Sequence, residues 1–223
     1  MAELFLIVVI VSYLLGSIPF GYLLVRIFRK EDVRLTGSGN IGATNVARTG
    51  SKGLAVATLL LDALKGYAAV MFAFWMAGRH RFQGQPLTSL YDQSTQLMDS
   101  RTVFLLAALA AFMAILGHVF TVWLRFKGGK GVAAAAGSFI ALAPRAMLVV
   151  FVLFVLVVAL TRYVSLGSIV AGAAFPLCVW WLGPAERTTA PILLLVAASS
   201  LLIIVRHKDN IRRLLAGTEN RVR

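Results

Sequence analysis

The sequence is poor in charged residues and in cysteine. Asp, Glu, Lys and Arg make up 14% of its 223 residues, and the single cysteine, Cys178, lies in an apolar run. So low a charge content excludes a disordered chain and is untypical of a soluble domain. One cysteine excludes a disulfide framework within the chain and a cysteine-based metal site, and the three histidines lack an HExxH-like spacing. We therefore expect neither a metal ion nor a cofactor.

Hydrophobic residues dominate instead, at 59% of the chain, with a mean hydropathy of +0.84. A membrane-spanning helix needs about 20 mostly apolar residues. The apolar runs predict an all-α, polytopic membrane protein, one integral-membrane domain over residues 1–223 with seven transmembrane helices. Six or eight remain alternatives, because residues 131–161 can form a hairpin, separated at Pro144, or one kinked helix. The expected spans are 4–28, 54–77, 102–124, 131–144, 146–161, 164–183 and 188–206.

Basic residues give the chain a net charge of +13 and are unevenly distributed. Seven spans place 16 of the 22 Lys and Arg residues on one side and five on the other, with Lys65 inside a span. The positive-inside rule then puts the N-terminus outside and the C-terminus in the cytoplasm. Residues 79–101 form an external loop, to which we assign no chemistry. Basic and aromatic residues are not interleaved, so we expect membrane lipids and an anionic substrate as partners, and no nucleic acid.

A polar, glycine-rich segment at residues 37–49, the first polar segment, follows the first apolar run on the basic side. Its glycines allow sharp turns that expose backbone N–H groups, and its short polar side chains and arginine can donate hydrogen bonds. This mixture is typical of an oxyanion site, most plausibly for phosphate at a membrane surface. The candidate binding residues are Ser38, Asn40, Thr44, Asn45 and Arg48.

The second polar segment, residues 117–131, ends in Lys127-Gly-Gly-Lys-Gly131 just before an apolar helix. A glycine turn that leads into a helix offers free N–H groups and the positive end of the helix dipole. The spacing of a P-loop is absent, so a flexible loop on the positive side of the membrane is an equal alternative. The candidate binding residues here are Lys127, Gly128, Gly129, Lys130 and Gly131.

The third polar segment, residues 206–219, alternates basic and apolar residues, which is also typical of a helix lying on anionic lipid. His207 and Asn210 are three residues apart, so they share a face if the last span continues through them. A histidine beside an amide could orient a hydroxyl group, although a lone histidine more often has a structural role. Glu219 is a further candidate at the end of this segment.

Two charged residues, Asp62 and Lys65, fall inside the second expected span. Either charge alone would cost about 2.5–3.5 kcal/mol on membrane insertion. We expect them to pair and to anchor the polar segments, with a direct substrate role as the alternative. His118 either faces the site or bonds a neighbouring helix, and Trp123 and Phe126 are typical interface anchors.

Together these segments resemble the bacterial inner-membrane acyl-phosphate:glycerol-3-phosphate acyltransferases. Thr121, Ile41 and Ala134 stand where that family often has Pro, Pro and Thr. The matching motifs are Gly37-Ser-Gly-Asn40, Gly42-Ala-Thr-Asn45 with Arg48, Leu61-Asp62 with Lys65-Gly66, Gly117-His118, Phe126-Lys-Gly-Gly-Lys-Gly-Val132, and Arg206-His207 with Asn210-Ile211, Arg213-Leu214 and Gly217-Thr-Glu219.

The resemblance implies seven transmembrane helices and a cytoplasmic active site in the bacterial inner (plasma) membrane. It implies transfer of a fatty acyl group from acyl phosphate to the sn-1 hydroxyl of glycerol 3-phosphate, which gives lysophosphatidic acid and phosphate in the first step of phospholipid synthesis. A functional link to the soluble enzyme that makes acyl phosphate follows. By this resemblance Ser38, Arg48 and a loop lysine would hold phosphate, while His207 and Asn210 would contact the glycerol.

The donor is a mixed anhydride, so the substrate hydroxyl can attack it directly, and we expect catalysis by positioning and charge stabilisation. The catalytic candidates are His207, Lys130 and Ser38, although no base is indicated beside Ser38. The general base could be His207, Glu219 or the substrate's own phosphate. A membrane transporter for a phosphorylated small solute is the alternative function, but it should carry more polar residues across the bilayer. A non-catalytic lipid-binding protein would not explain the glycines, serine and asparagines.

Overall fold

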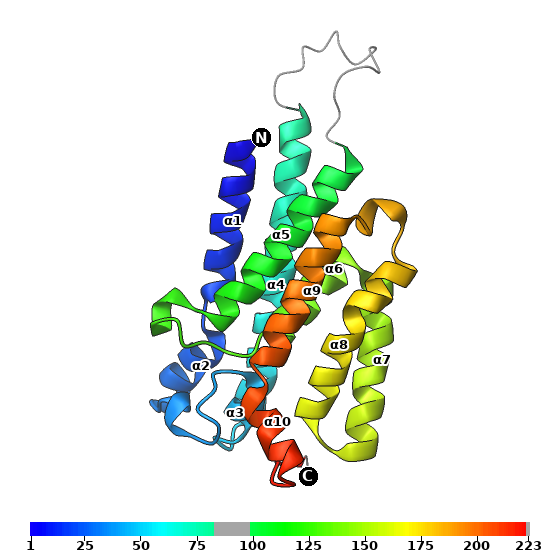
Figure 1. The fold of residues 1–223 in the computed structure, drawn as a ribbon. Coiled ribbons are helices and arrows are strands. Elements are labelled where there is room, and N and C mark those ends of the chain that lie inside the picture. Colours follow the sequence, from blue (N-terminus) through cyan, green and yellow to red (C-terminus); the bar gives the residue numbers. More distant parts are fainter. Residues whose placement is uncertain (83–98, 222–223) are drawn as a thin grey trace.

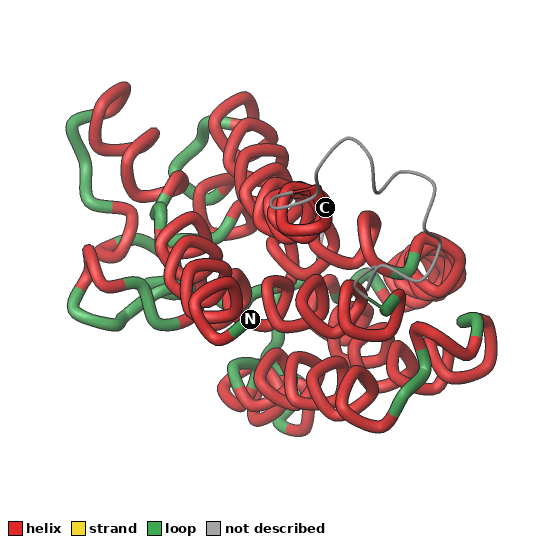
Figure 2. Tube along the Cα trace, turned by 90° about the horizontal axis from the view of Figure 1, so that it is seen from above, coloured by secondary structure: helices red, strands yellow, loops and turns green. Residues whose placement is uncertain are grey.

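The computed structural model describes residues 1–82 and 99–221, and these parts consist of helices and loops (Figures 1 and 2). Most of the expected external loop 79–101 lies outside the described residues. The α-helices are α1 (Ala2–Ser17), α2 (Phe20–Arg29), α3 (Ala43–Ala47), α4 (Lys52–Phe82), α5 (Ser100–Val119), α6 (Val132–Leu142), α7 (Pro144–Thr161), α8 (Val164–Leu182), α9 (Ala190–Val205) and α10 (Lys208–Leu215). Short 3-10 turns are η1 (Val33–Leu35), η3 (Val122–Leu124) and η4 (Ala185–Arg187).

The long apolar helices make the chain an all-α polytopic membrane protein. In the parts of the chain that the structure describes, five segments are long and apolar enough to cross a membrane, and α9 with α10 gives a sixth if that bent pair is one span. The expected span 131–144 is the exception. It shortens to the 11 residues of α6, or about 16 Å at 1.5 Å per residue, against an apolar core of about 30 Å. The shortening follows from the glycine loop before it and from Pro144, which separates it from α7 as predicted and is the first residue of that helix.

One expected span contains a break, and a second break follows the last expected span. Ile18 has ψ 116 because it precedes Pro19, and the first span therefore divides into α1 and α2. At the other end of the chain, α9 stops at Val205 and α10 leaves it at 54°. The sequence left open whether the last span continues through His207 and Asn210. It ends before both residues, since His207 is the cap residue of α10.

Packing brings α6 close to α4. A Cβ atom on Gly137 would lie 1.7 Å from the carbonyl oxygen of Ala63, and one on Gly66 would lie 2.1 Å from that of Ala134, so only glycine allows this approach. Helix α5 packs against α1, α4, α6 and α9 and forms the centre of the bundle. The largest apolar core joins α5, α6 and α9 through buried side chains such as Ile115, Phe139 and Ile192.

The three polar segments gather at one end of the molecule. Helices α2, α3 and α10 lie at the lower end in Figure 1, where the C-terminus also lies, while the N-terminus lies at the upper end. The loop after α5 runs between α2 and α9 in the same lower part. Residues that are far apart in the sequence thus come together where one composite site can form.

Candidate active site

Asn45 is the centre of the first polar segment. Its side-chain N–H groups donate to the carbonyls of Val33, Thr36 and Asn40 at 2.7–2.9 Å. Its Oδ1 atom accepts the Ser38 backbone N–H at 2.9 Å and the Ser38 hydroxyl at 3.2 Å. With only 1% of its surface exposed, this amide is committed to holding the loop closed. Its contribution to the site is therefore the shape of the loop.

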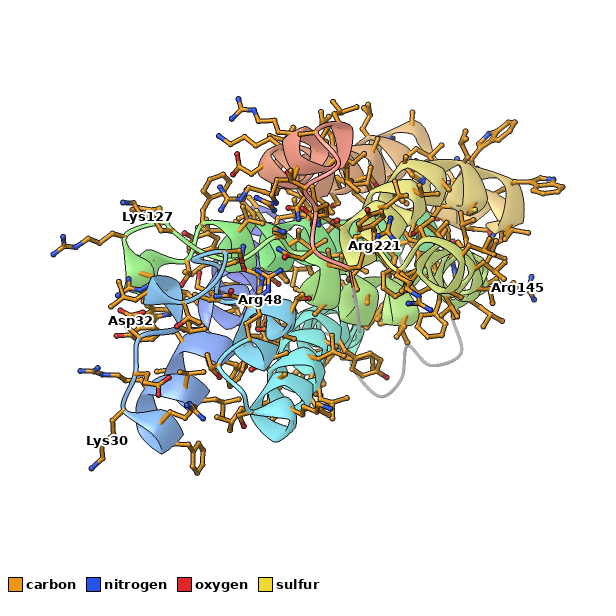
Figure 3. The ribbon with its side chains drawn as sticks, turned by 90° about the horizontal axis from the view of Figure 1, so that it is seen from below. Lys30, Asp32, Arg48, Lys127, Arg145 and Arg221 are labelled. Atoms are coloured by element: carbon orange, nitrogen blue, oxygen red, sulfur yellow. The ribbon has the colours of Figure 1, made fainter. Side chains whose placement is uncertain are left out.

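The other candidates of this segment lie around that centre. Asn40 accepts the Gly42 N–H at 2.8 Å, a turn that starts α3. Arg48 follows α3 and its side chain lies over Gly37, whose added Cβ would be 2.8 Å from Cδ of Arg48. Ser38, Thr44 and Arg48 are all exposed. Arg48 lies near the middle of the lower face in Figure 3, where a solvent-borne anion can reach its guanidinium.

The glycines of the second polar segment hold the loop against α5. The N–H groups of Gly128 and Gly129 donate to the carbonyls of Val119 and His118 at 3.1 and 3.0 Å. An added Cβ on Gly129 would lie 2.0 Å from Nε2 of His118. These two N–H groups are thus used inside the protein, which differs from the expected phosphate cradle.

Free backbone donors occur one step later, where α6 begins. Gly131 has φ 89, a conformation that favours glycine, and its carbonyl accepts the N–H of Ala135 at 2.8 Å as the first bond of the helix. The N–H groups of the first helical turn, from Val132 onward, have no acceptor within the helix and carry its positive dipole end. This turn is suited to an anion.

The two loop lysines are not equivalent. Lys127 is exposed and extends away from the molecule in Figure 3. Lys130 is half-buried, and its ammonium donates to Oδ1 of Asn210 at 2.6 Å. Burial, assisted by the nearby positive charges of Arg213 and Arg48 and opposed by Glu219, lowers the pKa of Lys130 to about 8. The structure therefore places Lys130 among the other candidates and Lys127 apart from them.

Glu219 organises the third polar segment. Its Oε1 atom accepts from the Asn210 amide at 2.7 Å and from the Ser165 hydroxyl at 2.8 Å, and its Oε2 atom accepts from Arg213 at 2.6 Å. Burial favours the neutral acid, but these three donors outweigh it and hold the pKa of Glu219 below its ordinary value. Glu219 is thus an ionised acceptor that fixes Asn210, and Asn210 in turn contacts Lys130.

His207 lies beside this chain of contacts. It is 2% exposed, and its Nδ1 atom is 2.8 Å from the carbonyl of Ile203. A carbonyl only accepts, so Nδ1 carries the proton and Nε2 is left as an acceptor. Burial lowers the pKa of His207 to about 4, and the nearby Lys130 charge acts in the same direction. The neutral imidazole can accept a hydrogen bond from a substrate hydroxyl.

Sequence reasoning missed Ser165 and Arg213. Ser165 lies at the start of an apolar helix, α8, where nothing in the sequence marks it. Arg213 lies in the segment whose basic pattern is also typical of a helix on lipid, and its contact with Glu219 is seen only in the fold. Trp123 and Phe126 are exposed, as expected of interface anchors. Within the described residues, no cluster of three or more His, Cys, Asp or Glu side chains could hold a metal ion.

A cavity of about 390 Å³ lies away from the polar segments. Its lining is mainly apolar and comes from the α6–α7 junction, the end of α8 and the start of α9. Arg187, which also lines it, donates to the carbonyl of Leu142 at 3.2 Å and stacks on Phe104. These contacts cap the end of α6, so Arg187 has a structural explanation, and we assign the cavity no substrate.

Known proteins resemble the chain over nearly its whole length. A family model described as glycerol-3-phosphate acyltransferase matches residues 6–217. The glycerol-3-phosphate acyltransferase of Rhodopseudomonas palustris (strain BisB5) is 45% identical, covering 100% of this chain and 98% of the relative. That of Agrobacterium fabrum is also 45% identical, covering 96% and 89%.

Two solved structures share the fold. The crystal structure of PlsY (YgiH), an integral membrane glycerol 3-phosphate acyltransferase, in its glycerol 3-phosphate form has a TM-score of 0.81 at 35% identity. The match covers 98% of this chain and 96% of that one. The lysophosphatidic acid form of PlsY has a TM-score of 0.78 at 34% identity, covering 98% and 95%.

Proposed function

The chain belongs to the glycerol-3-phosphate acyltransferase family, and from that membership we propose that it transfers a fatty acyl group from acyl phosphate to the sn-1 hydroxyl of glycerol 3-phosphate. The products are lysophosphatidic acid and phosphate, and the reaction opens phospholipid synthesis. The observation that carries the proposal is the contact chain Lys130–Asn210–Glu219 beside His207. Relatives this similar are acyltransferases, so the transporter alternative has no support.

The acceptor substrate needs an anion site and a site for its hydroxyl groups. Arg48, with its two-pronged guanidinium, and Ser38 are the groups we assign to the phosphate of glycerol 3-phosphate. Nε2 of His207 accepts from the sn-1 hydroxyl, and Asn210, held by Glu219, contacts the glycerol from the other side. A structure with glycerol 3-phosphate and one with lysophosphatidic acid are known for the similar PlsY, which fits this acceptor and this product.

The donor phosphate needs a second cationic site. Lys130 and the N–H groups at the start of α6 supply it, since Lys130 comes two residues before the first residue of that helix. Thr44 is exposed on the first segment and is a secondary candidate for the donor. Two other predicted donors are less suited to this phosphate. Lys127 extends outward, and the N–H groups of Gly128 and Gly129 already donate to carbonyls of α5.

The chemical step is a displacement at the acyl carbon. The sn-1 oxygen forms the new ester bond to the carbonyl carbon, the bond from that carbon to the phosphate oxygen breaks, and phosphate leaves with the bonding electrons. Lys130 and the α6 dipole stabilise the charge that develops on the leaving phosphate. No covalent enzyme intermediate is required, and Ser38 acts as a hydrogen-bonding group.

The hydroxyl proton must reach an acceptor. Glu219 already accepts three hydrogen bonds, and its lowered pKa makes it a poor base. His207, with a pKa of about 4, is also weak. A phosphate group has a second pKa of about 6, which makes it a better proton acceptor than either near neutral pH. We therefore assign the proton to a substrate phosphate, and His207 orients the hydroxyl.

The membrane arrangement that fits this function has seven crossings, with α6 as a half-length fourth. The N-terminus is outside, and the C-terminus and active site face the cytoplasm in the bacterial inner membrane. The distribution of the 22 basic residues supports this, as does the position of the C-terminus at the end where the polar segments gather. A soluble enzyme that makes acyl phosphate would then deliver this donor to the cytoplasmic side. There, membrane lipids would surround the acyl chain of the donor.

Purified protein tests the donor directly. Acyl phosphate with glycerol 3-phosphate should give equal amounts of phosphate and lysophosphatidic acid, while acyl-CoA and acyl-carrier protein should give neither product. Loss of activity in Lys130→Met, with activity kept in the matched surface variant Lys127→Met, would place the donor at the α5–α6 loop. Activity with acyl-CoA but not acyl phosphate would overturn the proposed donor.

A further inference from the structure

A buried cluster of two charged residues and one histidine lies between α4 and α5, apart from the groups assigned to substrate. The Lys65 ammonium is 2.8 Å from Oδ1 of Asp62, and Nδ1 of His118 is 3.5 Å from the same oxygen. All three residues are at most 4% exposed. The expected pairing of Asp62 with Lys65 is thus confirmed. Charged residues inside membrane spans are rare and are usually kept for a function.

The cluster reaches the first polar segment through Lys65. Its ammonium also donates to the carbonyl of Ile18 at 2.6 Å, a carbonyl at the break between α1 and α2. Helix α2 begins two residues later and packs tightly on the first segment, because an added Cβ on Gly21 would lie 1.9 Å from the carbonyl oxygen of Ile41. Lys65 therefore fixes the direction in which α2 leaves α1.

The cluster reaches the second polar segment through His118. The Nδ1 side of its ring faces Asp62, and the Nε2 side meets Gly129, as the 2.0 Å distance to an added Cβ shows. The carbonyl of His118 accepts the Gly129 N–H as well. The next residue is Lys130, whose ammonium contacts Asn210. An unbroken series of contacts thus leads from Asp62 to the cationic group of the site.

We propose that Asp62, through His118 and with Lys65, is a positioning residue for Lys130: it holds the His118 ring against Gly129, and so sets where the Lys130 ammonium meets the donor phosphate. This inference rests on the proposed role of Lys130. Asp62 touches neither substrate. Its effect on the reaction passes through the loop, because a displacement of about 1 Å of a group that aligns a reaction can lower the rate about 100-fold.

A double-mutant cycle separates positioning from general support of the fold. Asp62→Asn and Lys130→Met are each compared with the wild type, and then combined. Asp62→Asn should lower kcat/KM by about 100-fold, mainly through the KM for acyl phosphate. In the Lys130→Met background the same change should cost less than about twofold, since the group that it positions is gone. Ser199→Ala, which removes a buried hydroxyl that bonds only within α9, is the control and should match the wild type.

Two outcomes overturn the proposal in distinguishable ways. If the losses in Asp62→Asn and Lys130→Met multiply, Asp62 acts independently of Lys130, and only the positioning inference fails. If Lys130→Met is as active as the wild type, the proposed role of Lys130 fails first and the inference falls with it.

A second set of variants tests the contact between Gly129 and His118, and it remains informative if the Asp62→Asn protein does not accumulate in the membrane. Gly129→Ala alone should lower kcat/KM because the new methyl group meets the His118 ring. In a His118→Ala background the same methyl group has room, so Gly129→Ala should cost less than about twofold there. An equal loss in both backgrounds would show that His118 does not hold the loop, and would overturn the proposal.

Discussion

The Lys130 ammonium lies 2.6 Å from the Oδ1 atom of Asn210, although 80 positions separate the two residues in the chain. The contact joins the loop before α6 to the short helix that follows α9. Since Asn210 is itself held by Glu219, the position of Lys130 depends on the C-terminal segment. Two separate stretches of sequence, the second and third polar segments, therefore determine where one positive charge lies.

Lys130 and Lys127 should differ sharply in activity. Loss of a charge-assisted hydrogen bond to phosphate costs about 1.5–3 kcal/mol, which is about 10- to 150-fold in rate. We expect that loss in Lys130→Met, and a change of less than about twofold in Lys127→Met because that side chain extends outward. Steady-state kinetics with acyl phosphate measure both. Equal losses would show that the loop acts through its total charge.

The reaction should weaken in mild alkali. The pKa of Lys130 is lowered to about 8, so its charge is lost as the pH rises through that value and the KM for acyl phosphate should rise. The free energy of unfolding should instead rise with pH. The folded pKa lies below the unfolded one, so the charged form costs stability below pH 8, and this cost disappears between pH 8 and the ordinary value of 10.5.

Rates and unfolding temperatures between pH 7 and 9.5 test both trends. Lys130→Arg is the control, because arginine stays protonated throughout this range. Its KM should stay level over the same interval. An identical alkaline loss in Lys130→Arg would assign the titration to another group.

His207 should behave as a hydrogen-bond acceptor. His207→Ala removes the acceptor for the substrate hydroxyl, and one such bond is worth about 0.5–1.5 kcal/mol, or about 2- to 13-fold in rate. His207→Gln keeps a side-chain oxygen that can accept, so it should retain more activity than His207→Ala. The pH profile of kcat between 5.5 and 7.5 should have the same shape in both variants. Equally inactive Ala and Gln variants would instead indicate a true general base.

Arg48 should act through its geometry as well as its charge. Arg48→Lys keeps one positive charge but loses the paired N–H groups that match two phosphate oxygens. The KM for glycerol 3-phosphate should rise by about tenfold, since one charge-assisted bond is worth about 1.5–3 kcal/mol, while kcat changes little. Titration of the initial rate against glycerol 3-phosphate measures this. An unchanged KM would exclude Arg48 as the substrate clamp.

Asn45 should prove to be a structural residue. Asn45→Ala leaves the carbonyls of Val33, Thr36 and Asn40 without their donor, at about 1–3 kcal/mol for each unsatisfied buried group. We expect a lower unfolding temperature together with loss of activity. Thr44→Ala, next in the chain but exposed, should keep the wild-type unfolding temperature. Activity lost at an unchanged unfolding temperature would indicate direct substrate binding by Asn45.

Local chemistry made part of this structure predictable. The missing N–H of Pro144 marks the start of α7, and the cost of isolated charges in lipid predicts that Asp62 meets Lys65, as it does. The grouping of the polar segments at one end follows from counting spans. These features depend on neighbouring residues in the sequence or on the cost of placing charges in the bilayer. Both can be judged from the sequence before the fold is known.

Other features depend on tertiary contacts and could not be predicted. An asparagine amide serves a ligand or a loop equally well, so the sequence does not tell that Asn45 closes the first segment. The break at His207 leaves its ring 2.8 Å from Ile203 and places Asn210 on a separate helix. Ser165 gains its role only because Glu219 folds back on α8.

The shortness of α6 has a consequence for how the product leaves. Helices α6 and α7 meet at Ala143. The 18 residues of α7 extend about 27 Å from that joint and the 11 residues of α6 about 16 Å, so the start of α6 falls about 11 Å short of the far end of α7. With the donor held at the start of α6, as we propose, this offset would put the donor phosphate below the membrane surface, near the depth of the lipid phosphates. Lysophosphatidic acid would then form with its tail already among lipid tails, and it would leave sideways into the leaflet without exposing that tail to water.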